Sequence, residues 1–196
     1  MAPEALLWDF GDTLVDERWM RRCPAAHPEW EAAWTAVMDH WADRWNAGEV
    51  GMPEVFAALA DRTGMTQHDV AAHARDCCRR LVFNPAAWRV AREHRLPQAL
   101  VTVNPDLVAR YIVPAYELAT VFDVIVVSYA EGTVDKPSLC RRALDRLGFE
   151  SDRSAALLID NRQDLVHAWQ AAGGAGYWFR GDEQFRRDVR GLLGPS

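Results

Sequence analysis

Lysine is almost absent from this sequence of 196 residues: among 22 basic residues, Lys136 is the only lysine and the other 21 are arginines. A lysine ammonium is a compact point charge on a flexible stem, and a planar guanidinium does not replace it in a narrow polar site. Chance is the alternative explanation, because a strong arginine bias still leaves a few lysines in a chain. Lys136 is therefore a candidate functional residue on composition alone.

Acidic residues outnumber basic ones by 28 to 22, and no apolar run reaches membrane-spanning length. The formal net charge of −6 argues against a broad surface for nucleic acid or anionic membranes, so we expect neither as a partner. An anionic substrate must then be attracted by local groups. Glu4 and Asp9 interrupt the only N-terminal stretch that resembles an export leader, so we expect a cytoplasmic protein. No pattern indicates an oligomeric state.

Cysteine is also sparse, and its spacing does not suggest a metal site. The four cysteines are Cys23, Cys77, Cys78 and Cys140. Cys77 and Cys78 are adjacent, which is an awkward geometry for a disulfide between them. We therefore expect reduced thiols.

A short apolar segment near the N-terminus leads directly into an aspartate. The segment Ala5-Leu6-Leu7-Trp8 is typical of a strand buried on both faces of a parallel sheet. Asp9 then lies at the carboxyl end of this strand, which is where open α/β sheets bind their ligands. The alternative is that Asp9 only caps a following helix. Gly11 leaves room for a close approach of the backbone.

The next seventy residues have a helical pattern with no strand signal. Four tryptophans, together with Val37 and Met38, recur at short helical steps of mostly three and four between residues 29 and 45, which predicts an amphipathic helix. Pro53 opens a second helix, and Thr66 with Asp69 caps a third. We expect an inserted all-helical cap domain over residues 16–84, with the tryptophan stripe in its core rather than in a substrate pocket. The core domain then comprises residues 1–15 and 85–196.

Strand and helix signals alternate after Pro85. The predicted strands are residues 98–103, 121–128, 155–159 and 175–179, and helices are predicted between them and after the last. This alternation predicts an α/β fold with a doubly wound, Rossmann-like parallel sheet.

Polar side chains from several strand ends should meet at the carboxyl edge of that sheet. Taken singly, Thr102 fits a strand-end hydroxyl, Asp164 a first-turn helix residue and Lys136 a solvated loop lysine. Their convergence with Asp9 and Asp160 on one edge is harder to dismiss. Two carboxylates suit a hard cation such as Mg²⁺, and a hydroxyl and an ammonium beside them suit a phosphoryl group.

Four short motifs, in this order and spacing, resemble the haloacid dehalogenase-like (HAD) hydrolase superfamily over nearly the whole chain. The matching segments are Asp9-Phe10-Gly11-Asp12-Thr13-Leu14 for the first motif (usually D-x-D-G-T-L), Thr102 for the second, Lys136-Pro137 for the third, and Asp160 with Asp164 for the fourth.

The resemblance implies sheet order 5-4-1-2-3, a helical cap of the C1 type and a covalent intermediate on Asp9. It also implies Mg²⁺ held by Asp9, the backbone carbonyl of Gly11 and Asp160, with Asp164 supporting the metal site. Phosphate would be bound by Thr102, Asn104 and Lys136. The expected substrate is a small phosphorylated molecule.

The first motif departs from the family pattern at one position. Gly11 stands where the family carries its general acid and base, and Asp12 stands where glycine is usual. General acid–base assistance is typically worth ~10²–10⁴-fold in rate. Three readings are open: Asp12 or a held water substitutes, giving a slow phosphatase; the chain is a 2-haloacid dehalogenase; or it is a binding protein without turnover. We predict the phosphatase, with Asp9, Asp12 and Lys136 as its catalytic residues.

Three arginines directly after the first motif, Arg18, Arg21 and Arg22, could face the substrate. Exposed arginines are common, so the sequence favours a solvated cap surface for them.

Overall fold

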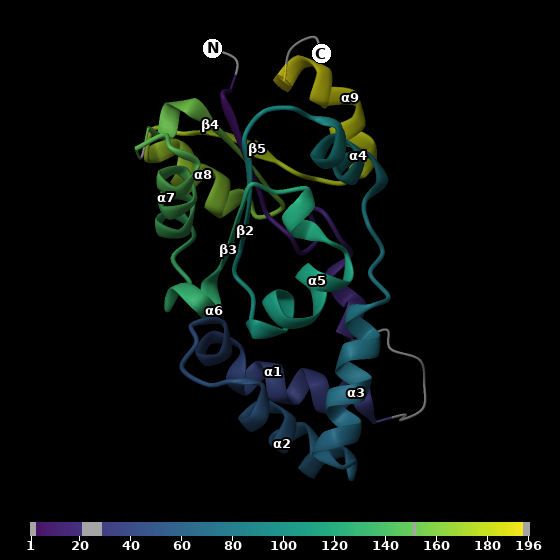
Figure 1. Cartoon of the computed structure of the whole chain (residues 1–196). Coiled ribbons are helices and arrows are strands. Elements are labelled where there is room, and N and C mark those ends of the chain that lie inside the picture. Colours follow the sequence, from purple (N-terminus) through teal and green to yellow (C-terminus); the bar gives the residue numbers. More distant parts are fainter. Residues whose placement is uncertain (1–2, 21–28, 151, 194–196) are drawn as a thin grey trace.

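The computed structural model describes residues 3–20, 29–150 and 152–193, which form a five-stranded parallel sheet with helices around it (Figure 1). The sheet order is β3-β2-β1-β4-β5, so the predicted topology is confirmed. The strands are β1 (Ala5–Trp8), β2 (Gln98–Thr102), β3 (Val124–Val127), β4 (Ala156–Asp160) and β5 (Ala175–Trp178).

Helices cover both faces of the sheet, as expected for parallel strands joined by crossovers. On one side α7 packs against β2 and β3, and α8 packs against β4 and β5. On the other side α4 and α9 lie against each other (Figure 1). Their bounds are α4 (Pro85–Glu93), α7 (Lys136–Leu147), α8 (Gln163–Ala171) and α9 (Asp182–Leu193).

The central strand β1 has no exposed side chain, which explains its continuous apolar sequence. Alternate side chains enter two separate cores: Leu6 and Trp8 pack on the side of α9, and Leu7 packs on the side of α7 and α8. Trp8 meets Phe185 of α9 edge-to-face, with ring centroids 5.9 Å apart. The strand is thus held rigidly at the point where Asp9 follows it.

The described part of residues 16–84 consists of helices and the segments that join them, apart from an isolated bridge of Phe83 with Val15, and its helices lie beyond the carboxyl ends of the strands (Figure 1). The elements are η1 (Glu17–Met20), α1 (Trp30–Asn46), α2 (Met52–Thr63) and α3 (Gln67–Cys78). Gly64 ends α2 in the left-handed conformation with φ 69°, and Thr66 caps α3 by accepting a hydrogen bond from the Asp69 amide. The proposed cap boundaries at residues 16 and 84 stay a prediction.

The tryptophan stripe of α1 is mostly internal to this helical unit. Trp30, Trp34 and Trp45 are buried, and Trp34 packs edge-to-face on Trp45. Trp45 also joins the unit to the sheet domain, because its Nε1 donates to Oδ1 of Asp106 at 2.8 Å. The stripe thus fills the helical core and anchors it beside the end of β2.

The third predicted strand is shorter than expected. It begins at Val124, because Val121 closes the short helix η3 (Leu118–Thr120) and the Asp123 carboxylate accepts the amide of Gln98. It ends at Val127, where α6 (Ser128–Glu131) starts.

The helix predicted after Pro105 is irregular. It contains a π-helical turn, η2 (Val108–Ile112), followed by α5 (Val113–Ala115). Pro114 has no amide hydrogen to continue a regular α-helical ladder, which accounts for the wider turn before it. A short helix η4 (Arg153–Ala155) precedes β4.

The expectation of reduced thiols is wrong at Cys77. Cys77 is disulfide-bonded, whereas Cys78 and Cys140 are buried free thiols. Adjacency disfavours a bond between Cys77 and Cys78, but it does not restrict the pairing of either with a distant cysteine. No helix in the described part of the chain is long and apolar enough to cross a membrane.

Gly174, in the turn between α8 and β5, packs so closely that a side chain there is expected to lower stability. A Cβ atom on Gly174 would lie 2.1 Å from Nε1 of the fully buried Trp169. Gly174→Ala is therefore expected to destabilise the fold by about 1–3 kcal/mol through overpacking. Gly191→Ala is the matched control: a Cβ there meets nothing within 4 Å inside α9, so it should stabilise by up to about 1 kcal/mol. Urea midpoints measure both changes, and an unchanged midpoint for Gly174→Ala would contradict this packing.

Candidate active site

Asp9 lies at the carboxyl end of β1, in the centre of the sheet. Its amide donates to the carbonyl of Ile159 at 2.9 Å, which continues the pairing of β1 with β4 by one residue. Its Oδ1 accepts from Nζ of Lys136 at 2.5 Å, and its Oδ2 accepts from the Thr13 hydroxyl at 3.3 Å. The side chain keeps 13% of its surface exposed, so one edge of the carboxylate is open to a small ligand.

Lys136 is the first residue of α7 rather than a solvated loop lysine. Asp135 caps the helix by accepting the amide of Ser138 at 3.0 Å, and this fixes where the lysine side chain starts. The ammonium lies between two carboxylates, 2.5 Å from Oδ1 of Asp9 and 3.0 Å from Oδ2 of Asp160. Only 1% of the lysine side chain is exposed. The one lysine of the chain thus occupies the narrow polar site that its chemistry suits.

Burial and the oppositely charged neighbours shift the pKa values of Asp9 and Lys136 in opposite directions. Burial, with a smaller contribution from the charge of Asp160, raises the pKa of Asp9 to about 6, although Lys136 opposes that rise. Burial lowers the pKa of Lys136, but the two neighbouring carboxylates outweigh it and hold that pKa above its ordinary value. The ammonium therefore stays charged at neutral pH.

Asp160 ends β4 and is almost fully buried. Its Oδ1 accepts the amide of Arg162 at 2.8 Å, and its Oδ2 has only the ion pair with Lys136, without hydrogen-bond geometry. Asp164, in the first turn of α8, does not contact this cluster through any described bond. It pairs with Arg162 at 2.6 Å in solvent, with 65% of its side chain exposed, and this pair lowers its pKa. Its supporting role in a metal site stays a prediction.

Thr102 ends β2, the strand next to β1, and Asn104 follows it by two residues. The Thr102 hydroxyl is buried and accepts from Nδ2 of Asn104 at 2.6 Å. The amide of Asn104 donates to the Ser128 hydroxyl at 3.0 Å, which holds the turn in place. Asn104 lines a cleft of about 250 Å³ between the helical unit and the sheet, together with Asp12, Glu17, Trp34 and Met38. Asp12 and Asn104 come from the loops that follow β1 and β2, whereas Asp9, Lys136 and Asp160 are not among the residues that line this cleft.

Solved structures share this fold. A HAD family enzyme from Bacteroides thetaiotaomicron superposes with a TM-score of 0.75 at 15% identity, covering 97% of this chain and all of that one. An L-2-haloacid dehalogenase from Xanthobacter autotrophicus, with chloropropionic acid covalently bound, superposes with a TM-score of 0.66 at 19% identity, covering 98% and 85%. This chain has the HAD fold. The sequence itself matches no protein-family model and no curated protein.

The donor atoms at the edge of this HAD fold suit one hard cation. Asp9 and Asp160 each place a carboxylate oxygen within 3.0 Å of Nζ of Lys136, and Oδ2 of Asp160 is buried without a hydrogen bond. Mg²⁺ is typically held by one or two carboxylates, with waters and substrate phosphate completing its shell. Within residues 3–20, 29–150 and 152–193, no larger group of His, Cys, Asp or Glu is arranged to hold a metal ion. The donor type of these two carboxylates therefore fits Mg²⁺.

The loop after Asp9 brings residues together that the motifs alone do not single out. The Phe10 carbonyl accepts the amides of Thr13, Leu14 and Val15, which folds the loop tightly back on itself. The Thr13 hydroxyl bridges Asp9 and the Asn161 amide, so it joins the first and fourth motifs of the HAD fold. The threonine in the motif was visible in the sequence, but its bridging role depends on the position of β4.

Asp12, the sequence candidate for the missing acid, is exposed and adopts φ 52°. Its Oδ1 accepts the amide of Glu17 at 3.0 Å. Glu17 lies beside Gly11 and lines the same cleft, and no motif or spacing in the sequence marks it.

Of the three arginines considered after the first motif, only Arg18 is described; Arg21 and Arg22 lie outside the described residues. Arg18 is exposed and pairs with Asp16 at 2.8 Å, and it reaches the edge of the cleft.

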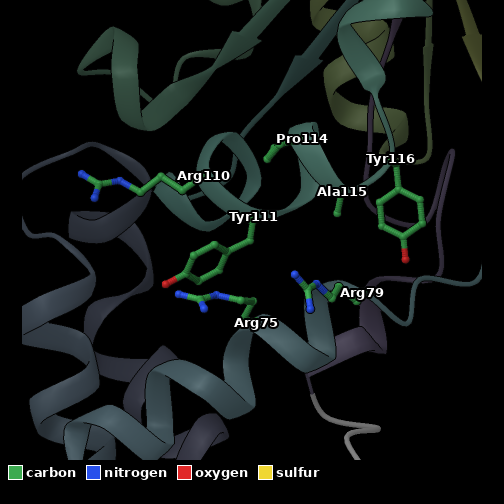
Figure 2. A pocket seen from close by; sticks show the side chains of 7 residues that line it. All are labelled: Arg75, Arg79, Arg110, Tyr111, Pro114, Ala115 and Tyr116. Atoms are coloured by element: carbon green, nitrogen blue, oxygen red, sulfur yellow. The ribbon is translucent and has the colours of Figure 1, made fainter.

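A larger cavity of about 660 Å³ lies elsewhere, between α3 and the segment 110–116 (Figure 2). Arg75, Arg79 and Arg110 line it, and Arg75 stacks over the Tyr111 ring at 5.2 Å. No carboxylate of the Asp9 cluster reaches this cavity. It is separate from the candidate active site.

Proposed function

We propose that this protein is a Mg²⁺-dependent hydrolase of a small phosphorylated metabolite, with Asp9 as its nucleophile. The observation that carries the proposal is the buried row Asp9–Lys136–Asp160 at the carboxyl edge of the sheet. The Bacteroides thetaiotaomicron enzyme was also solved in complex with magnesium and inorganic phosphate, with a TM-score of 0.70 at 14% identity, covering 92% of this chain and 96% of that one. That complex supports a phosphate-binding chemistry for the shared fold.

Each residue has a defined task in the proposed reaction. An Asp9 oxygen attacks phosphorus, and the bond from phosphorus to the leaving oxygen breaks, which leaves an aspartyl phosphate. Water then attacks phosphorus and restores the Asp9 carboxylate. Lys136 holds the carboxylates in place and offers its charge to the phosphoryl oxygens, and Thr102 and Asn104 donate hydrogen bonds to them. Mg²⁺ held by Asp9, Asp160 and the Gly11 carbonyl, with Asp164 nearby, would neutralise phosphate charge.

A 2-haloacid dehalogenase is the second candidate. Gly11 favours it, because halide leaves without a proton and needs no acid at this position. The dehalogenase of similar fold favours it as well. Asp160 argues for the phosphatase, because a second buried carboxylate has a task in metal binding and none in halide displacement. A binding protein without turnover is the third reading.

The three readings differ in what chelation does. The phosphatase predicts that phosphate release from p-nitrophenyl phosphate or a sugar phosphate stops in EDTA and returns with Mg²⁺. Chloride release from 2-chloropropionate that is equal with and without EDTA would establish the dehalogenase instead. If neither product forms from any substrate, yet inorganic phosphate with Mg²⁺ raises the melting temperature, the protein binds without turnover.

A further inference from the structure

The space beside Gly11 is filled by a carboxylate from another part of the chain. An ideal Cβ on Gly11 would lie 2.7 Å from Cδ of Glu17 and 2.8 and 3.1 Å from its two carboxylate oxygens. Gly11 is buried, and its neighbours in the loop are fixed by the Phe10 carbonyl. The missing side chain at position 11 has therefore been replaced in space by a carboxylate six residues further along.

The location of this carboxylate is close to that of an aspartate at position 11. The carboxyl carbon of such an aspartate would be bonded to Cβ at about 1.5 Å, and the Glu17 carboxyl carbon is 2.7 Å from the same point. Both groups would then occupy the volume next to Gly11. Glu17 also lines the 250 Å³ cleft together with Asn104, and Gly11, the residue that it contacts, lies two positions after Asp9 in the same loop.

A local hydrogen bond holds the backbone of Glu17 in place. Glu17 opens the short helix η1, and its amide donates to Oδ1 of Asp12 at 3.0 Å. The tight loop at Phe10 brings Val15 back into a bridge with Gly11, which turns the chain toward the cleft again. Asp12 thus occupies the usual glycine position, with φ 52°, and holds the start of the segment that carries Glu17.

We propose that Glu17 is the general acid and base of this active site, in place of the residue that Gly11 lacks, and that Asp12 is its positioning residue. The inference rests on the proposed phosphatase function. As Asp9 attacks phosphorus, the Glu17 carboxylic acid gives its proton to the leaving oxygen and becomes a carboxylate. That carboxylate then takes a proton from the water that attacks phosphorus, so inorganic phosphate leaves and both Asp9 and Glu17 return to their starting forms.

The test is Glu17→Gln, assayed with two leaving groups. An alkoxide needs a proton to depart, so turnover of glycerol 3-phosphate is expected to fall by ~10²–10⁴-fold. p-Nitrophenolate departs without help, so p-nitrophenyl phosphate should give a stoichiometric burst of p-nitrophenol followed by slow hydrolysis of the aspartyl phosphate. Glu183→Gln, an exposed change of the same kind in α9, is the control and should leave both rates unchanged.

Gly11→Ala tests the geometry with Glu17 intact. Its methyl group must displace the Glu17 carboxylate, so it is expected to produce the same burst and a partial loss with the alkyl phosphate. Because both variants act on one group, the double variant should be no slower than Glu17→Gln alone. Melting temperatures close to that of the wild type show that the fold is kept.

The outcomes separate this inference from the proposed function. A wild type that releases phosphate, with Glu17→Gln at the same rates and without a burst, overturns the role of Glu17 and leaves the phosphatase standing. Asparagine at position 12 can still accept the hydrogen bond from the Glu17 amide. If Asp12→Asn lowers turnover as much as Glu17→Gln or more, the acid is Asp12, and the role proposed for Glu17 is overturned. A wild type with no phosphate release overturns both.

Discussion

Asp9→Asn is expected to reduce phosphate release to background, a loss of about 10⁴-fold or more, since it removes the attacking group itself. The same change should not lower stability. Burial raises the pKa of Asp9 to about 6 from an ordinary value of 3.8, so the ionised carboxylate is less favourable in the folded chain than in the unfolded one. Asparagine keeps the shape of the side chain and removes that cost.

The raised pKa of Asp9 also predicts the pH range over which Asp9→Asn and the metal-free wild type differ in stability. Because the folded pKa is higher, the carboxylate form of Asp9 costs stability progressively as the pH rises from about 3.8 through about 6. The advantage of Asp9→Asn over the wild type is therefore expected to appear across this window and to level off above it. Urea denaturation in EDTA at several pH values measures it. Asp61→Asn, an exposed change in α2, is the control. A loss of stability in Asp9→Asn that parallels its loss of activity would contradict this account.

Lys136→Met is expected to be the most destabilising single change at the site. It leaves Asp9 and Asp160 facing each other without the ammonium that lies between them. Removing one partner from a buried ion pair typically costs about 3–5 kcal/mol, because the remaining charge is uncompensated. Turnover should fall as well, by ~10²–10³-fold or more, since a preorganised positive charge is lost.

Added Mg²⁺ and a second substitution distinguish uncompensated charge from lost packing as the cause of the instability of Lys136→Met. Mg²⁺ should raise the urea midpoint of Lys136→Met more than that of the wild type, because the cation then supplies the missing positive charge. Adding Asp160→Asn should recover part of the stability in EDTA. Lys136→Arg is not expected to restore activity, since the side chain is only 1% exposed and a guanidinium is larger and planar. A Lys136→Met protein of wild-type stability in EDTA would contradict the role assigned to the ammonium.

The location of the site could be predicted because it follows from topology. The segment Ala5–Trp8 is apolar without interruption, and the alternation after Pro85 requires parallel strands. Parallel strands end at the same edge, so Asp9, Thr102 and Asp160 had to approach one another. The single lysine pointed to the same place, because an ammonium held between carboxylates has a role that arginine does not fill.

The details that depend on loop paths could not be predicted. The position of Glu17 is set by three amides that converge on the Phe10 carbonyl and by one bond to Asp12, and none of these contacts has a period or a motif. Asp164 fits the fourth motif by spacing, yet its side chain pairs with Arg162 in solvent. Spacing along a chain fixes the starting point of a side chain, whereas its direction depends on neighbours that are distant in sequence.

The central claim is that Asp9 carries the phosphoryl group, and trapping that intermediate tests it most directly. The protein is mixed with p-nitrophenyl phosphate and Mg²⁺, quenched, reduced with borohydride and digested for peptide mass spectrometry. Borohydride reduces an acyl phosphate to an alcohol, so the account predicts homoserine in place of the aspartate at position 9, and a larger yield in Glu17→Gln. Turnover with an unmodified Asp9, or with the reduced residue at Asp12 instead, would contradict it.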